Sequence, residues 1–187
     1  MEEDPQIEFY IDAGNDEQNA TIEEALPASK AELVVKKTLQ AAGIMQPVML
    51  TLLITNDETM RDMNKQYRQQ NKTTDVLSFP LLDKPLADAP TDQLWTPSEN
   101  QEAALGAKAE NAPAFVTPAE LLINLGDIVI SWPTVLRQAN EAGHSAIYEL
   151  LYLISHGVLH LIGYDDQSEA GYSAMVQKQQ SVLAAMG

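Results

Sequence analysis

Residues 146–166 constrain the fold of this chain more than any other stretch. The first nine of them, AIYELLYLI, are apolar around almost the whole circumference of a helix, which predicts a buried helix. His156 and His160 follow at a spacing of four, so a helix places both imidazoles on one face, one turn apart. Gly163 predicts the end of that helix, because glycine readily adopts the left-handed conformation that closes a last turn.

This pattern predicts a metal site. Two neutral imidazoles on a buried helix each need a polar partner, and one shared metal ion satisfies both. After the turn at Gly163, either Asp165 or Asp166 can return to the same point as a third ligand. Metzincin-type sites hold Zn²⁺ in this way, with a fourth position left open. The alternative is a pair of packed, hydrogen-bonded histidines without metal.

The residue after His156 argues against protease chemistry. Metalloproteases of the HExxH type carry Glu directly after the first histidine, where it acts as general base. This chain has Gly157 at that position. The sequence therefore predicts a metal site without that base, and peptide hydrolysis by that route is not expected.

The distribution of charge favours a nucleic-acid partner, although the net charge of −16 argues against one. Residues 1–32 hold ten acidic residues and one basic residue, and residues 83–120 hold seven acidic and two basic ones. The rest of the chain is nearly neutral, with ten acidic and eight basic residues. We therefore expect an acidic N-terminal region, an acidic Pro/Ala-rich insert at about 83–120, and a near-neutral working core.

Half of the basic residues of this core recur at spacings of four, three and four. They form one ridge if the predicted helix continues through them, and such a ridge can engage phosphates. The alternative is a solvated helix face. The four residues are Arg61, Lys65, Arg68 and Lys72.

Composition predicts a soluble cytoplasmic protein of one domain, with no membrane partner. The chain has 187 residues and no cysteine, so neither disulfides nor thiolate zinc ligands are available. No run approaches the roughly 20 apolar residues of a membrane span. The first five residues, MEEDP, lack the basic and apolar regions of a signal peptide.

The order of elements predicts an α+β fold: a single compact domain with a mixed sheet of about four strands packed against helices. Its buried central helix would be zincin-like and carry the metal ligands. Residues 14–27 read as a loop, residues 82–118 as a long excursion anchored by Trp95, and Gly126 as a bulge or close backbone approach. The expected strands are 6–12, 48–55, 73–80 and 121–131, and the expected helices are 29–42, 58–69, 132–142, the histidine helix and 168–187.

Four further polar residues could support the metal site, hold the local backbone or have no role. Asp127 lies in an apolar strand, so we expect it to be buried and either to orient a ligand imidazole or to hold backbone. Asp75 is expected to bond nearby backbone at the start of a strand. Glu149 either supports the site or faces solvent, and His144 is expected to be exposed without a role.

Four motifs, taken together, resemble the YbeY family of bacterial zinc-dependent endoribonucleases that mature ribosomal RNA. The resemblance runs in the family's order from about residue 48 to the C-terminus, with the acidic start and the 83–120 insert outside it. The motifs are NKQYR at 64–68, TDVLSFP at 74–80, LGDIVI at 125–130 and HGVLHLIGYD at 156–165.

The resemblance implies one Zn²⁺ per chain, held by His156, His160 and the residue at position 166. The family pattern has His at that position and this chain has Asp166. A carboxylate binds Zn²⁺ at about the same distance as an imidazole, but its negative charge makes bound water less acidic and lowers activity. Asp165 matches the family's own Asp. The family's basic residue near the metal falls on Arg68, which is the expected catalytic residue.

The implied function is a single-strand-specific, metal-dependent endoribonuclease of ribosomal RNA maturation. It would act at the 3′ end of 16S rRNA and in ribosome quality control, with ribosomal RNA and ribosomal subunits, not DNA, as partners. Arg61, Lys65 and Lys72 would contact the RNA. One alternative is a ribosome-assembly binding factor with a structural metal and little nuclease activity. Another is a metallohydrolase of a different substrate such as peptide, which Gly157 disfavours.

Overall fold

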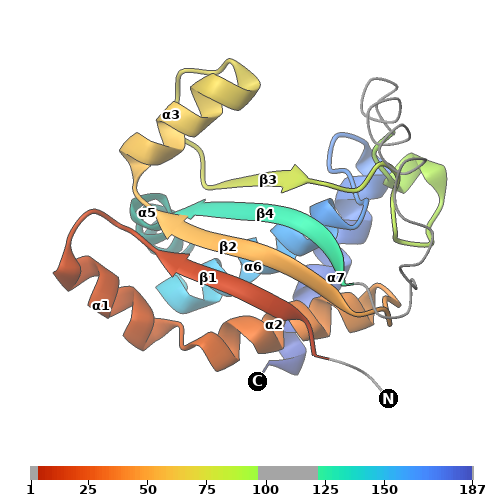
Figure 1. The fold of residues 1–187 in the computed structure, drawn as a ribbon, viewed down its shortest axis with the longest axis horizontal. Coiled ribbons are helices and arrows are strands. Elements are labelled where there is room, and N and C mark those ends of the chain that lie inside the picture. The colour runs from red at the N-terminus through yellow and green to blue at the C-terminus, as the bar shows by residue number, and fades with distance from the viewer. Residues whose placement is uncertain (1–3, 97–121, 187) are drawn as a thin grey trace, which may run out of the picture.

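A four-stranded sheet forms the centre of the computed structural model, which describes residues 4–96 and 122–186 (Figure 1). The strand order is β1-β2-β4-β3. β1, β2 and β4 run parallel, and β3 pairs antiparallel with β4 at one edge. The predicted mixed sheet of about four strands is therefore confirmed. The strands are β1 Gln6–Ile11, β2 Val48–Thr55, β3 Val76–Pro80 and β4 Ile123–Ser131.

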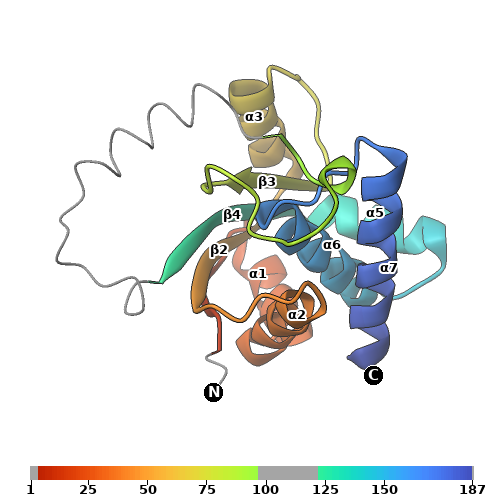
Figure 2. The ribbon, with the colours of Figure 1, turned by 90° about the vertical axis from the view of Figure 1, so that its right-hand side faces the viewer.

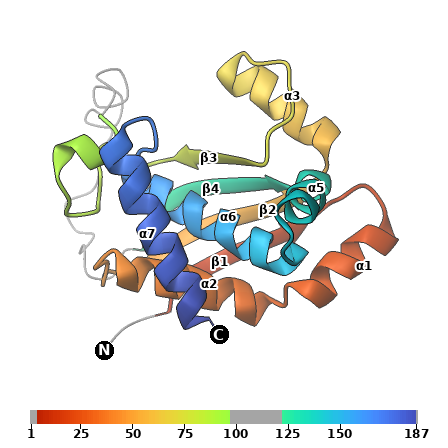
Figure 3. The same ribbon diagram turned by 180° about the vertical axis from the view of Figure 1, so that it is seen from behind.

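Helices cover one face of this sheet. In Figure 1, α2, α6 and α7 lie behind the strands; in Figure 3, seen from behind, they lie in front of them, and Figure 2 shows α6 between the sheet and α7. α6 contacts β3 and β4 on one side and α2, α5 and α7 on the others. The helices are α1 Asp16–Ala25, α2 Ala28–Ala41, α3 Asp57–Arg68, α5 Trp132–Ala142, α6 Ala146–Leu161 and α7 Glu169–Ala185.

α6 is the buried central helix that the sequence predicts. Ser145 caps it by accepting a hydrogen bond from the backbone N–H of Tyr148. Ile154 and Val158 are fully buried on it. The buried hydroxyl of Ser155 pairs with that of Thr38 on α2 at 2.9 Å, so the polar group on this apolar helix is satisfied. No helix within residues 4–96 and 122–186 is long and apolar enough to cross a membrane.

Gly126 produces both features that the sequence predicts for it, a bulge and a close backbone approach. Met49 of β2 pairs with Asn124, but Thr51 pairs with Asp127, so β4 carries one extra residue between these points. Gly126 has φ +125°, and a Cβ there would collide with the carbonyl oxygen of Phe79 on β3. A side chain at this position would force β3 and β4 apart.

The end of α6 is fastened to the segment that precedes residue 97. Gly163 takes φ +132°, which confirms the predicted helix end, and a Cβ on it would collide with Pro85. The Trp95 indole N–H donates to the carbonyl of His160 at 2.7 Å, and the Trp95 backbone N–H donates to that of Gly163 at 2.8 Å. The predicted anchoring role of Trp95 is confirmed. The remainder of the 83–120 insert, from residue 97 onward, lies outside the described residues.

The prediction of a loop at residues 14–27 is wrong, because α1 occupies most of it. Asn15 caps the helix by accepting from the backbone N–H of Gln18, and two acidic residues in the first turn favour the positive end of the helix dipole. Ile22 and Leu26 bury their side chains completely or nearly so. These two apolar residues are too few to produce a helical pattern in an acidic sequence.

Asp57 joins the starts of α3 and α5 to the end of β4. One carboxylate oxygen accepts hydrogen bonds from the hydroxyls of Ser131, Thr134 and Thr73. The other oxygen pairs with the Arg137 guanidinium at 2.9 Å. Burial alone would raise the pKa of Asp57, but the hydrogen bonds from Ser131, Arg137 and Thr134 outweigh it and lower the pKa to about 2.

We expect Asp57→Ala to lower the free energy of unfolding by about 2–4 kcal/mol at pH 7, because it leaves several donors without their charged acceptor. The stabilisation from the lowered pKa is present above the ordinary carboxyl value of 3.8 and is lost as pH falls towards 2. The difference between wild type and variant should therefore shrink between pH 5 and pH 2. Urea unfolding followed by circular dichroism measures it, with the exposed Asp62→Ala of the same helix as control. Equal losses in both variants would contradict the role of Asp57.

Candidate active site

A cavity of about 190 Å³ lies where β3, the C-terminal half of α6 and the last residue of α3 meet. It brings together four of the residues predicted from the sequence, which come from positions about 100 residues apart: Arg68, His156, His160 and Asp166. We call it the histidine cavity. The other residues that line it are Thr74, Asp75, Val76 and Ser78.

His156 and Asp166 lie at the spacing of two ligands on one metal ion. The Nε2 of His156 is 3.5 Å from a carboxylate oxygen of Asp166, longer than a normal hydrogen bond. Ligands about 2.0–2.1 Å from a tetrahedral Zn²⁺ are separated from each other by roughly 3.4 Å. The pair therefore leaves room for a cation to bind both atoms.

His160 is held in the protonation state that binds metal. Burial lowers its pKa, and the neighbouring His156 lowers it further, while Asp166 and Asp165 act in the opposite direction and Arg68 lowers it again. The imidazole is thus neutral at pH 7, as a metal ligand must be. His160 and His156 line the same cavity as Arg68 and Asp166.

The donor set suits Zn²⁺, but the side chains do not form a complete ligand group as they stand. Two imidazoles and one carboxylate are ordinary zinc ligands. Among the described residues, however, no three His, Cys, Asp or Glu side chains are grouped closely enough to hold a metal ion. Asp166 is 43% exposed, so its side chain is free to turn towards both imidazoles.

Asp165, the other possible third ligand, is engaged in the turn that follows α6. Its carboxylate accepts from the backbone N–H of Gln167 at 3.2 Å, and its own N–H donates to the carbonyl of Gln93 at 3.0 Å. Asp165 therefore helps to shape the turn that carries Asp166. The carboxylate of Asp166 is the better placed of the two to be a metal ligand.

The packing around Gly157 explains why this position does not carry the Glu of HExxH proteases. A Cβ at this position would lie 2.9–3.1 Å from three side-chain atoms of Ile128 on β4, tighter than ordinary contacts. α6 thus packs against the sheet through this residue. A Glu at 157 would point into the core and away from the histidine cavity, so protease chemistry of the HExxH type does not fit this packing.

The basic ridge is shorter than predicted. α3 ends at Arg68, and Gln69 takes a left-handed conformation with φ 60°. Lys72 therefore lies in the following loop, where its carbonyl accepts from the side-chain amide of Asn64 at 2.9 Å. Arg61, Lys65 and Arg68 are exposed on α3, which packs against the sheet through the buried Met60, and of these Arg68 lines the histidine cavity.

Two of the further polar residues, Asp75 and Asp127, have clear partners or positions. Asp75 accepts from the backbone N–H of Val76 at 2.8 Å, as predicted, but it also lines the histidine cavity. The expectation that Asp127 is buried is wrong, because the residue is exposed. Ile128 faces α6, so its neighbour Asp127 points to the opposite face of the sheet and cannot orient an imidazole.

His144 and Glu149 form a pair, which corrects two expectations. The Nε2 of His144 lies 2.6 Å from a carboxylate oxygen of Glu149, whose side chain is 12% exposed. Glu149 is therefore buried and does not face solvent. His144, which was expected to be exposed without a role, contacts Glu149. Their spacing of five residues across a helix start could have indicated this contact.

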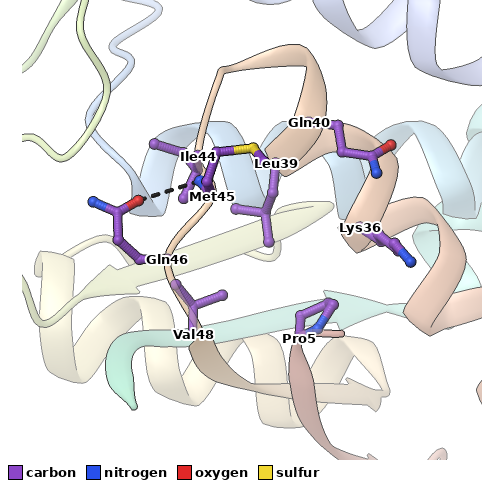
Figure 4. A pocket seen from close by; sticks show the side chains of 8 residues that line it. All are labelled: Pro5, Lys36, Leu39, Gln40, Ile44, Met45, Gln46 and Val48. Carbon is purple, nitrogen blue, oxygen red and sulfur yellow. Dashed lines mark hydrogen bonds between the residues drawn. The ribbon is translucent and has the colours of Figure 1, made fainter. Parts of the chain in front are cut away.

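A second hollow, between α2 and the start of β2, is too small to bind a ligand. Its volume of about 20 Å³ has room for roughly one water molecule. In Figure 4 the backbone N–H of Met45 donates to the side chain of Gln46 at its edge, at 3.2 Å. The residues that line it are Pro5, Lys36, Leu39, Gln40, Ile44, Met45, Gln46 and Val48.

The family model described as Endoribonuclease YbeY matches residues 12–187. The match starts well before residue 48, where the resemblance in the motifs begins, so α1 and α2 fall within it. A protein of Desulforamulus reducens named Endoribonuclease YbeY is 35% identical over 92% of this chain and 94% of its own length. One of Roseiflexus sp. with the same name is 36% identical over 83% of this chain and 81% of its own length. This chain belongs to the YbeY family of endoribonucleases.

Proposed function

We propose that this chain is a single-strand-specific, metal-dependent endoribonuclease that acts in ribosomal RNA maturation, at the 3′ end of 16S rRNA, and in ribosome quality control. The observation that carries the proposal is the histidine cavity, in which Arg68, His156, His160 and Asp166 meet. Family membership supports the reaction class, because the curated relatives are named endoribonucleases. Its partners would be ribosomal RNA and ribosomal subunits.

A Zn²⁺ ion, one per chain, would be held by His156, His160 and Asp166. When bound, it would supply a Lewis acid for a phosphoryl oxygen and lower the pKa of water. The neutral imidazole of His160 and the 3.5 Å separation between His156 and Asp166 support this ligand set. The carboxylate of Asp166 adds a negative charge that a third histidine would not, so the site should be less electrophilic.

Arg68 holds the scissile phosphate. Its guanidinium presents a planar fork of donors that matches phosphate oxygens, and it stabilises the charge that develops on them during cleavage. It occupies the last residue of α3, so Arg61 and Lys65 extend from it along an exposed helix face. These residues and Lys72 would bind the phosphates that follow, in a salt-dependent manner. Because the cavity is a small hollow, a single strand can enter it more readily than a duplex.

The alternative, a ribosome-assembly binding factor with a structural metal, is supported by two residues of the sequence. Asp166 stands where the family pattern has His, and Gly157 stands where HExxH proteases carry their general base. Such a protein would bind zinc and ribosomal subunits without cleaving RNA. Measuring zinc content and cleavage on the same preparation separates the two functions.

We expect Arg68→Ala to lower kcat on a single-stranded ribosomal precursor RNA by about 10²–10³-fold, because it removes a donor to the developing charge. His156→Ala should abolish cleavage together with metal binding. Gel analysis of end-labelled RNA measures the rates. Arg61→Ala, on the same helix but outside the histidine cavity, is the matched control and should mainly raise KM. Equal rates for wild type, Arg68→Ala and His156→Ala would defeat the assignment.

Asp166→His tests whether position 166 is a ligand. The substitution should raise both zinc occupancy and RNA cleavage, because it removes a negative charge and supplies an imidazole. Asp166→Ala should lower zinc occupancy below one ion per chain in plasma mass spectrometry. Asp165→Asn, which keeps an acceptor for the Gln167 N–H, is the control and should leave zinc content unchanged. No change in either Asp166 variant would place this residue outside the coordination shell.

A further inference from the structure

A larger cavity, of about 260 Å³, opens beside the histidine cavity, between α6, α7 and β3. The two cavities share four residues, which form a common wall: Asp75, Val76, His156 and Asp166. A molecule whose phosphate reaches Arg68 on one side of this wall can therefore place an adjoining group on the other side. Figure 3 shows α6 and α7 side by side.

The lining of this second cavity combines aromatic and apolar side chains with polar ones. Tyr152 of α6 and Tyr172 of α7 contribute aromatic rings, and Met175 adds an apolar surface. Glu149 and Gln179 supply polar atoms. Of the described residues that line it, none is Lys or Arg. We call it the tyrosine cavity.

The tyrosine cavity is unsuited to a phosphate and suited to a planar neutral ring. Its described lining offers no Lys or Arg to bind a phosphate, and the carboxylate of Asp75 opposes one. Every nucleobase has a π-face that stacks on an aromatic side chain without regard to sequence. Its volume lies just below the roughly 300–1,000 Å³ of typical small-molecule sites, which fits one base better than a base pair.

One of the two tyrosines is held in place and the other is free to meet a ligand. The Tyr152 ring is half-buried and lies nearly parallel to that of Tyr148, with 6.5 Å between the ring centroids. The side-chain amide of Gln179 donates to the carbonyl of Tyr152 at 3.1 Å, which ties α7 to α6 at this point. Tyr172 is 58% exposed, so a base can cover its ring without displacing a protein contact.

We propose that the tyrosine cavity binds one unpaired nucleobase of the RNA, that of a nucleotide adjoining the scissile phosphate. The inference rests on the proposed function, because the histidine cavity is taken to hold that phosphate. Tyr172 is a substrate-binding residue that stacks on the base, and Tyr152 forms the opposite wall. A base that is paired in a duplex cannot enter, so the cavity accounts for selection of single-stranded RNA.

The test combines a protein substitution with a substrate substitution. Binding of the zinc-loaded full chain to a short fluorescent 2′-O-methyl oligonucleotide, which resists cleavage, is measured by anisotropy. The same oligonucleotide is made with an abasic position on either side of the target phosphate. Tyr172→Ala should weaken binding of the intact strand about 5–150-fold, the effect expected for one stacked base. Tyr172→Phe should retain most of the affinity, because the ring remains.

The abasic change at one of the two positions should weaken binding to wild type by a similar factor and have almost no effect on Tyr172→Ala. Tyr10→Ala, which removes a ring of similar exposure on β1, is the control and should change nothing. The inference is wrong if Tyr172→Ala binds the intact strand as tightly as Tyr10→Ala does. It is also wrong if, at both positions, the abasic change weakens binding to Tyr172→Ala as much as binding to wild type. Cleavage of unmodified RNA by wild type is measured separately. If wild type does not cleave unmodified RNA, the proposed nuclease activity is wrong, but the binding measurements still decide whether the tyrosine cavity binds a base.

Discussion

The close packing of α6 against β4 determines the geometry of everything around the candidate site. Gly157 lets the helix approach Ile128 to the distance at which a Cβ would be crowded. α2, α5 and α7 enclose the remaining sides of the helix. His156 and His160 are therefore carried on a rigid element, and their positions do not depend on a loop. The same packing excludes a glutamate between them, so it separates this site from HExxH proteases.

The other side chains of the candidate site lie on elements next to this rigid helix. Asp166 follows a turn that Trp95 fastens to the end of α6 through the carbonyls of His160 and Gly163. Arg68 arrives from the opposite side, at the end of the exposed helix α3. The proposed cation site and the proposed phosphate site thus share one small cavity. Although the chain as a whole is acidic, Arg61, Lys65 and Arg68 are exposed on α3, and Arg68 lines this cavity.

The elements that the sequence predicted best are those with a one-sided or all-round apolar pattern. β2 and α6 have such patterns, and the glycine at 163 marks where α6 ends. α1 was missed because Ile22 and Leu26 are its main buried contacts. Asp127 was misplaced because a strand of buried residues gives no sign of which side chain faces away from the helices. The ridge was expected to include Lys72 only if the helix continued, and it does not, because the chain makes a left-handed turn at Gln69 that no glycine signals.

The candidate site was predictable to the extent that motifs carry it. His156, His160 and Arg68 were identified from spacing and family resemblance, and the structure places them with Asp166 around one cavity. The tyrosine cavity was not predictable, because Tyr152 and Tyr172 lie on different helices and meet through tertiary packing. Neither residue belongs to a local pattern that distinguishes it from an ordinary surface or core tyrosine.

X-ray absorption spectroscopy at the zinc edge of the zinc-loaded protein tests the central claim most directly. We predict a first shell of nitrogen and oxygen at about 2.0–2.1 Å, with the outer-shell scattering of two imidazoles. His160→Ala should remove one of these imidazoles, and Asp166→His should add a third. A spectrum with one imidazole or none, or one that neither substitution changes, would show that these side chains do not converge on a single metal ion.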